Sequence, residues 1–97
     1  MRLPEVVLKD AAAYIERNGW IQGRATDQSG AACILGAIWK VEGDVAESEH
    51  ASAVVAQRID TLGFEKDPRS KLHVAAQWND KAGRTVDEVL ALLRGDS

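Results

Sequence analysis

Apolar residues recur at helical spacing along most of the chain, and the most apolar stretch runs from Ser29 to Gly43. Within it, Lys40 is the only charged residue before the last two positions. A helix with so little polar surface packs inside a fold, with neighbours on most sides. We therefore expect a central helix over residues 30–42, with Asp27 or Ser29 as its N-cap.

An amphipathic helix is predicted before this run. Pro4 suits the first helical position, where its missing N–H would have no partner, and Asn18-Gly19 tolerates the backbone of a helix C-terminus. Residues 21–28 lack clear periodicity and are interpreted as a loop. The apolar stripe of this first helix consists of Val7, Leu8, Ala11, Ala12 and Ile15.

The helix predicted after the central run begins with an Asp-x-x-Glu capping box, formed by Asp44 and Glu47, and a start at Ser48 is the alternative. Gly63 ends it, and Arg58 is expected on its solvated side. Its buried stripe has a spacing typical of a helix and consists of Ala51, Val55, Ile59 and Leu62.

Capping residues also predict the last two helices. Asp67-Pro68 is an N-cap followed by a first helical residue, which predicts a short helix over residues 69–78. A second capping box, from Thr85 to Glu88, opens the final helix, and Gly95 follows its end. The side chains expected to point inward from that helix are Val86, Val89, Leu90 and Leu93.

These patterns predict one all-α domain over residues 1–97, a compact bundle of about five helices around residues 30–42. No stretch alternates apolar and polar residues for long, so no strand is expected. Three of the five aromatic residues are tryptophans, and each can bury on the order of 200 Å². We expect Trp20, Trp39 and Trp78 to anchor a core built mostly of smaller side chains.

Composition places the chain among soluble globular proteins, with 45% apolar and 28% charged residues. The net charge of −3 and the pI of about 5.3 argue against nucleic-acid binding that depends mainly on electrostatic attraction to phosphates. A single cysteine cannot form an internal disulfide, which favours a reducing compartment. Neither a secretory signal nor a run of transmembrane length is apparent. We expect a cytoplasmic protein with no membrane partner.

Cys33 is a candidate nucleophile. With Ser29 as N-cap, Cys33 lies about one turn into the helix, where unpaired N–H groups favour a thiolate. His73 or His50 would then act as the base, oriented by Asn79 or Asp80. The alternative is a small buried apolar residue, which is the common environment of cysteine. The sequence favours that alternative, because neither histidine lies in a recognisable catalytic motif.

Metal and cofactor sites have little support. One cysteine and two separated histidines do not give the paired spacing of a zinc site. His50 with Glu47 and Glu49 could hold a cation on a helix face, but a solvated charged face explains them better. We predict no metal and no cofactor.

The loop after Trp78 offers candidate binding residues, Asn79, Asp80 and Arg84. A polar pair that follows a large aromatic side chain could recognise a ligand or a partner. Turn chemistry is the alternative: Asn79 would be a left-handed C-cap, and Asp80 would bond backbone N–H groups of its turn or pair with Arg84. The nearby loop 21–28 is expected to share this surface.

Gly36 lies inside the central helix, where glycine costs about 1 kcal/mol relative to alanine. Lacking a Cβ, it allows a neighbour to approach closely. We expect that neighbour to be Val55, Ile59 or the Trp78 ring.

Three separated pieces of the chain form a recognisable pattern: Asn18-Gly19-Trp20; Cys33-Ile34-Leu35-Gly36-Ala37-Ile38; and Trp78-Asn79-Asp80 followed by Gly83-Arg84-Thr85 and Glu88-Val89-Leu90. The pattern resembles a family of small uncharacterised proteins from actinobacteria and the phages that infect them. The resemblance covers nearly the whole chain. It implies a cytoplasmic setting in an actinobacterial host, with either a bacterial or a phage origin, and it carries no catalytic residues over.

We therefore expect a small non-enzymatic protein that binds or regulates another protein, which would be a host protein if the chain is phage-encoded. One alternative is a cysteine-dependent enzyme that uses Cys33. Another is a helix-turn-helix protein whose helix beginning at Arg69-Ser70-Lys71 enters a DNA groove. If the other helices do not cover residues 30–42 by themselves, the simplest way to bury that apolar surface is a homodimer.

Overall fold

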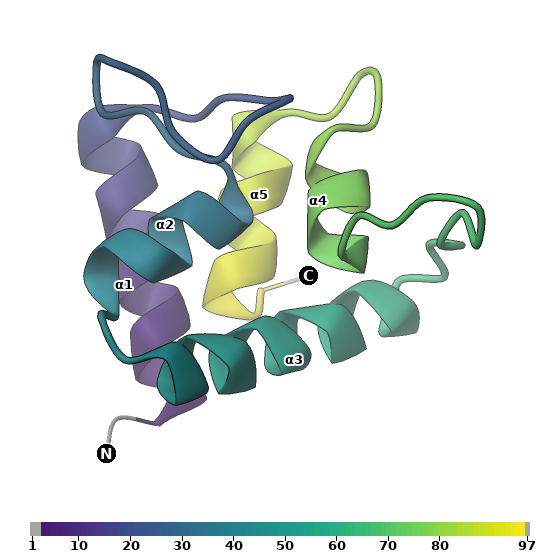
Figure 1. The fold of residues 1–97 in the computed structure, drawn as a ribbon, viewed down its shortest axis with the longest axis horizontal. Helices are drawn as coiled ribbons and strands as arrows, with labels where there is room; N and C mark the ends of the chain where they lie inside the picture. The colour runs from purple at the N-terminus through teal and green to yellow at the C-terminus, as the bar shows by residue number, and fades with distance from the viewer. Residues whose placement is uncertain (1–2, 97) are drawn as a thin grey trace.

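Five helices form the framework of the computed structural model, which describes residues 3–96 (Figure 1). α1 packs mainly against α2 and α5, while α3 crosses below the others and contacts all four of them. The described residues contain no strand beyond isolated bridges at Ala32, so the predicted all-α fold is confirmed. The helices are α1 (Pro4–Asn18), α2 (Ile34–Val41), α3 (Val45–Thr61), α4 (Val74–Asn79) and α5 (Val86–Arg94).

One hydrophobic core draws on all five helices. The stripe predicted for α1 is confirmed, since all five of its residues are buried. α3 and α5 add their own stripes, while α4 contributes Ala75 and Trp78. The remaining buried members of the core come from the α2 segment, α3 and α5, and are Ala32, Ile34, Ala37, Ile38, Ala51, Val55, Ile59, Val89, Leu92 and Leu93.

α2 begins four residues later than the predicted range of 30–42. Its N-cap is Cys33, whereas Asp27 accepts hydrogen bonds from the N–H groups of Ser29 and Ala31 and closes a turn. Residues 31–33 instead pair with the preceding loop: the Ala32 N–H donates to the Gly19 carbonyl at 3.0 Å. Gly30, at φ +95°, has a backbone outside the right-handed helical region. Tertiary pairing therefore replaces the first predicted turn.

α2 is also less enclosed than predicted. Helices α1, α3 and α4 cover part of its circumference, and the uncovered part carries Trp39, which is 57% exposed. The prediction that all three tryptophans anchor the core is thus wrong for Trp39. It holds for Trp78, which is 4% exposed, while Trp20 is half-buried.

Gly36 does allow a close approach, but the neighbour is not the predicted one. A Cβ built on Gly36 would lie 2.0 Å from the carbonyl oxygen of Ala25. The same oxygen accepts a hydrogen bond of 2.9 Å from the Cys33 N–H. The loop backbone, rather than α3 or Trp78, therefore occupies the space that the missing side chain leaves.

α3 begins as predicted, with the Asp44 carboxylate accepting from the Glu47 N–H at 3.0 Å. The Asp44 N–H donates to Glu42, so Glu42 takes the place expected for Glu47 in the capping box. Leu62 is 46% exposed rather than buried. Arg58 is half-buried, because its guanidinium donates to the last carbonyls of α5, at Leu92 and Leu93. Such contacts stabilise a helix C-terminus.

α4 is shorter than the predicted helix over residues 69–78. Asp67 does not cap it but accepts from the Arg69 N–H, and the Ser70 hydroxyl accepts from the Leu72 N–H. These local hydrogen bonds compete with helix formation and hold the chain in a turn. The N-cap is His73, whose Nδ1 accepts from the Ala75 N–H at 3.0 Å.

α5 confirms the predicted capping box, in which the Thr85 hydroxyl and the Glu88 carboxylate each bond the other's backbone N–H. Gly95 follows the helix in a left-handed conformation, as predicted. The inward side of the helix is turned slightly from the expected one, since Val86 is 39% exposed and Leu92 is fully buried.

Candidate functional site

Asn79 is fully buried and joins three segments of the chain. Its Oδ1 accepts hydrogen bonds from Trp20 Nε1 at 2.7 Å and from the Ile34 N–H at 3.2 Å. Its Nδ2 donates to the Ile21 carbonyl at 3.1 Å and to the Asp80 carboxylate at 2.9 Å. The left-handed C-cap interpretation is wrong, because Asn79 is the last residue of α4 and no described non-glycine residue has positive φ. The whole Asn79 amide is used inside the protein.

The loop after α4 and the loop after α1 lie together, as the sequence suggested. Gln22 donates to the carbonyls of Asn79 and Lys81, each at 3.0 Å, and the Gly23 N–H donates to Asp80 at 3.0 Å. The polar groups of the two loops therefore bond each other to a large extent. These hydrogen bonds hold the end of α4 against the loop that follows α1.

Arg84 is placed by contacts within its own segment. Its guanidinium carbon lies 3.7 Å from the centroid of the Trp78 ring, and its Nε donates to the Trp78 carbonyl at 2.8 Å. The carboxylate that pairs with it is Glu88, at 3.0 Å, rather than Asp80. Hydrogen bonds from Thr85, and then the interaction with Arg84, hold the pKa of Glu88 below its usual value. Asn79, Asp80 and Arg84 thus all take part in holding the fold.

Cys33 is buried at the start of α2, and its Sγ accepts from the Gly36 N–H at 3.4 Å. Burial raises the pKa of the Cys33 thiol, and the negative charge of Asp80 adds to the increase. A raised pKa opposes the thiolate that nucleophilic catalysis needs. The expected position one turn into the helix is wrong, because Cys33 is the N-cap residue.

We expect Cys33 to resist alkylation in the native protein at neutral pH. Cys33 is 6% exposed and burial raises the pKa of its thiol, and both properties slow its reaction with iodoacetamide. Mass spectrometry should show an unmodified chain under native conditions and a singly alkylated chain in denaturant. Complete alkylation of the native protein within minutes would instead support the enzyme alternative.

The other sequence candidates are placed as follows. Among the described residues, no group of three or more His, Cys, Asp or Glu side chains lies close enough to hold a metal ion. Glu47, Glu49 and His50 lie on α3. The residues proposed to read DNA, Arg69 to Lys71, precede α4, so that six-residue helix does not carry them.

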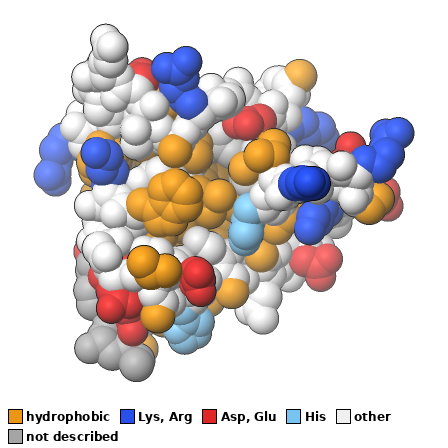
Figure 2. Space-filling model, viewed as in Figure 1, with side chains coloured by type: hydrophobic (Ala, Val, Ile, Leu, Met, Phe, Trp, Pro, Cys, Tyr) orange, Lys and Arg blue, Asp and Glu red, His pale blue; other side chains and the backbone are white. Residues whose placement is uncertain are grey.

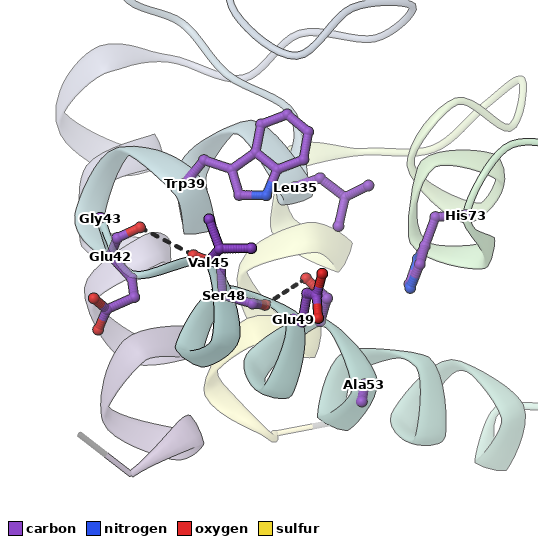
Figure 3. A pocket seen from close by; sticks show the side chains of 10 residues that line it. Leu35, Trp39, Glu42, Gly43, Val45, Ser48, Glu49, Ala53 and His73 are labelled. Atoms are coloured by element: carbon purple, nitrogen blue, oxygen red, sulfur yellow. Dashed lines mark hydrogen bonds between the residues drawn. The ribbon is translucent and has the colours of Figure 1, made fainter. Parts of the chain in front are cut away.

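A groove of about 730 Å³ opens between α2, the start of α3 and the residue before α4. Figure 2 shows apolar side chains gathered on this face of the molecule. The close-up in Figure 3 places Trp39 and Leu35 on one wall and Val45 near the α3 side. Trp39 is 57% exposed and Val45 is 73% exposed, so two large apolar side chains meet solvent side by side.

The floor of the groove is formed by α3, and its polar groups are already satisfied. The Ser48 hydroxyl donates to the Glu42 carbonyl at 3.0 Å, and the Ser52 hydroxyl donates to the Ser48 carbonyl at 2.8 Å. Both serines are buried. A ligand in the groove would therefore meet a mainly apolar surface.

Three titratable residues line the groove: Glu42, Glu49 and His73. No lysine or arginine lines it among residues 3–96, and the Glu42 carboxylate accepts from the Asp44 N–H at 3.1 Å. His73 projects from the wall opposite Leu35 (Figure 3). Burial, and then the nearby Lys66, lower the pKa of His73 from its usual 6.5, so the imidazole is neutral at pH 7.

Sequence reasoning missed this groove, because it placed Trp39 in the core. A signal was nevertheless present: Leu35 and Trp39 are one turn apart on a helix whose apolar surface exceeds what short neighbours cover. His73 was considered as a base for Cys33 and as part of a helix that enters a DNA groove. Its position before a short helix was hidden by the incorrect start predicted for α4.

The comparisons agree with the part of the sequence interpretation that concerns family. None of the described helices is long and apolar enough to cross a membrane. Comparison with curated proteins and with solved structures finds no significant match. A family model matches residues 1–95, so the expected membership of an uncharacterised family is confirmed: the chain belongs to a family of unknown function, DUF6197.

Proposed function

We propose that this chain is a small protein-binding module that docks a helical segment of another protein in the groove between α2 and α3. The observation that carries the proposal is the pair of exposed apolar side chains, Trp39 and Val45, beside an open apolar groove. Apolar patches rimmed by polar groups mark interaction sites on soluble proteins. A tryptophan at the centre of such a patch is a typical source of binding energy.

The docked segment is an amphipathic helix with an apolar face and flanking lysine or arginine residues. The groove lies between two helices and its lining is mainly apolar, which suits the helix-in-groove mode of recognition. Among the described residues that line it, Glu49 contributes a carboxylate and none is a lysine or an arginine. Charge complementarity therefore selects a basic partner.

The same charges disfavour a second copy of this chain as the occupant. A twofold homodimer would place the groove against itself. The carboxylate of Glu49 would then lie near its own counterpart, and like charges at an interface are unfavourable. The net charge of −3 adds to this repulsion.

The proposal is tested with a synthetic peptide of about 18 residues, five helical turns, composed of leucine on one face and lysine elsewhere. A matched peptide with glutamate in place of lysine is the charge control. We expect titration calorimetry to show binding of the lysine peptide and at least about tenfold weaker binding of the glutamate peptide. Trp39→Ser should weaken binding by about 30-fold, which corresponds to about 2 kcal/mol.

Trp39→Ser should leave the free energy of unfolding within about 1 kcal/mol of wild type, because the ring is largely exposed. Leu62→Ser is the matched control, since Leu62 is similarly exposed but lies outside the groove. It should bind the lysine peptide like wild type. Absence of peptide binding, or equal loss in both variants, would contradict the proposal. A concentration-dependent dimer that Trp39→Ser abolishes would show that a second copy occupies the groove instead.

The proposed cellular setting rests on the sequence resemblance. We place the protein in the cytoplasm of an actinobacterial host, as a bacterial or phage-encoded protein that acts by contact and without catalysis. If it is phage-encoded, the docked helix belongs to a host protein. The groove is preferred over the loop surface at Asn79, Asp80 and Arg84, because those side chains are engaged in internal contacts.

A further inference from the structure

We propose that docking in this groove is controlled by pH through His73, with the basic segment bound while the imidazole is neutral and released when it is protonated. The inference rests on the proposed function, since it concerns the same groove. His73 has two roles in the structure: it lines the groove, and it is the N-cap of α4.

The N-cap geometry determines which form of the imidazole the fold accepts. His73 Nδ1 accepts a hydrogen bond from the Ala75 N–H at 3.0 Å. In a protonated imidazole both ring nitrogens carry hydrogen, so neither can accept. Protonation therefore breaks the cap and places two N–H groups against each other. The ring must then leave its position on the groove wall.

Protonation also changes the charge of the groove. Lys66, in the segment between α3 and α4, already opposes a positive charge on His73. Across the groove, Glu49 on α3 provides the attraction for the basic segment. A histidinium among these groups offsets part of that attraction and repels the lysine or arginine residues of the segment. Loss of the cap and change of charge thus weaken docking in the same direction.

The pH window follows from the same surroundings. His73 is harder to protonate than an unperturbed histidine, so the transition lies below pH 6.5. A variant in which residue 73 does not titrate separates this transition from the effects of other groups.

The test measures the affinity of the lysine peptide at about pH 7.5 and at about pH 5.5, above and below the pKa of an unperturbed histidine. We expect wild type to bind at least about fivefold more weakly at the lower pH. His73→Asn should bind with nearly equal affinity at both, because asparagine is an effective N-cap that does not titrate. His50→Asn is the matched control, since His50 is the second of two histidines and is not among the residues that line the groove. It should keep the wild-type pH dependence.

Failure of this inference and failure of the proposed function give different results. Peptide binding that is the same at both pH values, or that weakens equally in His73→Asn, would overturn the pH control and leave the docking groove intact. Absence of binding already at about pH 7.5 would overturn both. A second readout needs no peptide: the wild-type free energy of unfolding should fall as pH decreases below 6.5, because the unfolded chain takes up the proton more readily than folded His73. His73→Asn should reduce that fall.

Discussion

Replacing Gly36 with alanine should lower the free energy of unfolding by about 3 kcal/mol or more, a fall in Tm of about 12 °C or more. The added Cβ would lie 2.0 Å from the Ala25 carbonyl oxygen. Because that atom belongs to the backbone, relief requires the whole loop to move away from α2. The movement would also break the hydrogen bond from the Cys33 N–H to Ala25. Thermal unfolding followed by circular dichroism measures the effect.

Gly43→Ala is the matched control. Gly43 connects α2 to α3, its backbone has no positive φ, and a Cβ there would meet nothing within 4 Å. The change should be neutral or stabilising by about 0.5 kcal/mol, through a less flexible unfolded chain. A Gly36→Ala protein as stable as wild type would show that the loop does not lie against α2.

Asn79→Ala should lower the free energy of unfolding by about 3–4 kcal/mol, a large part of the roughly 5–15 kcal/mol of a domain of this size. Alanine offers no acceptor to Trp20 Nε1 or to the Ile34 N–H, and no donor to the Ile21 carbonyl. Leaving buried polar groups without partners costs more than the net value of the bonds themselves. Urea unfolding at neutral pH provides the measurement.

Asp80→Ala provides the comparison for Asn79→Ala. Asp80 is exposed and accepts from the Gly23 N–H and from Asn79, so its loss should cost within about 1 kcal/mol. Equal effects of the two changes would mean that burial of Asn79 is not what matters. The comparison also affects functional tests: a partner lost by an Asn79 variant would indicate loss of the fold rather than loss of a contact.

Part of the fold could be predicted because some helices are specified by their own residues. Pro4 and Asn18-Gly19 bound α1, and the Thr85–Glu88 box begins α5, as the structure confirms. Caps of this kind satisfy N–H and carbonyl groups within a few residues, so a local pattern contains the whole interaction. The buried stripe of α1, and that of α3 apart from Leu62, follow from helical spacing for the same reason.

The beginnings of α2 and α4 could not be predicted, because other interactions compete with the helix there. Before α2, residues 31–33 pair with backbone groups of Gly19 and Ala25, which are distant in sequence. Before α4, side chains at Asp67 and Ser70 bond nearby N–H groups and hold a turn. Sequence patterns identify Asp67 as a capping residue but do not tell a helix cap from a turn.

The candidate site illustrates the same division. Asn79 was singled out as a polar residue after an aromatic one, but its burial depends on Trp20, Ile21 and Ile34, which only the folded chain brings to it. Trp39 was assigned to the core because α2 is apolar on nearly all sides. Whether such a helix is covered depends on where its neighbours pack, and here one side remains open beside α3.

The sequence by itself therefore determined the helical class, the caps of α1, α3 and α5 and the stripes that form the core, since these depend on contacts one or two turns apart. The tertiary structure decided which apolar side chains remain at the surface and which polar ones are buried. It alone joins Trp39, Val45 and His73 around one groove and places Asn79 among three segments. Burial and hydrogen-bond partners depend on residues distant along the chain, and no local pattern records them.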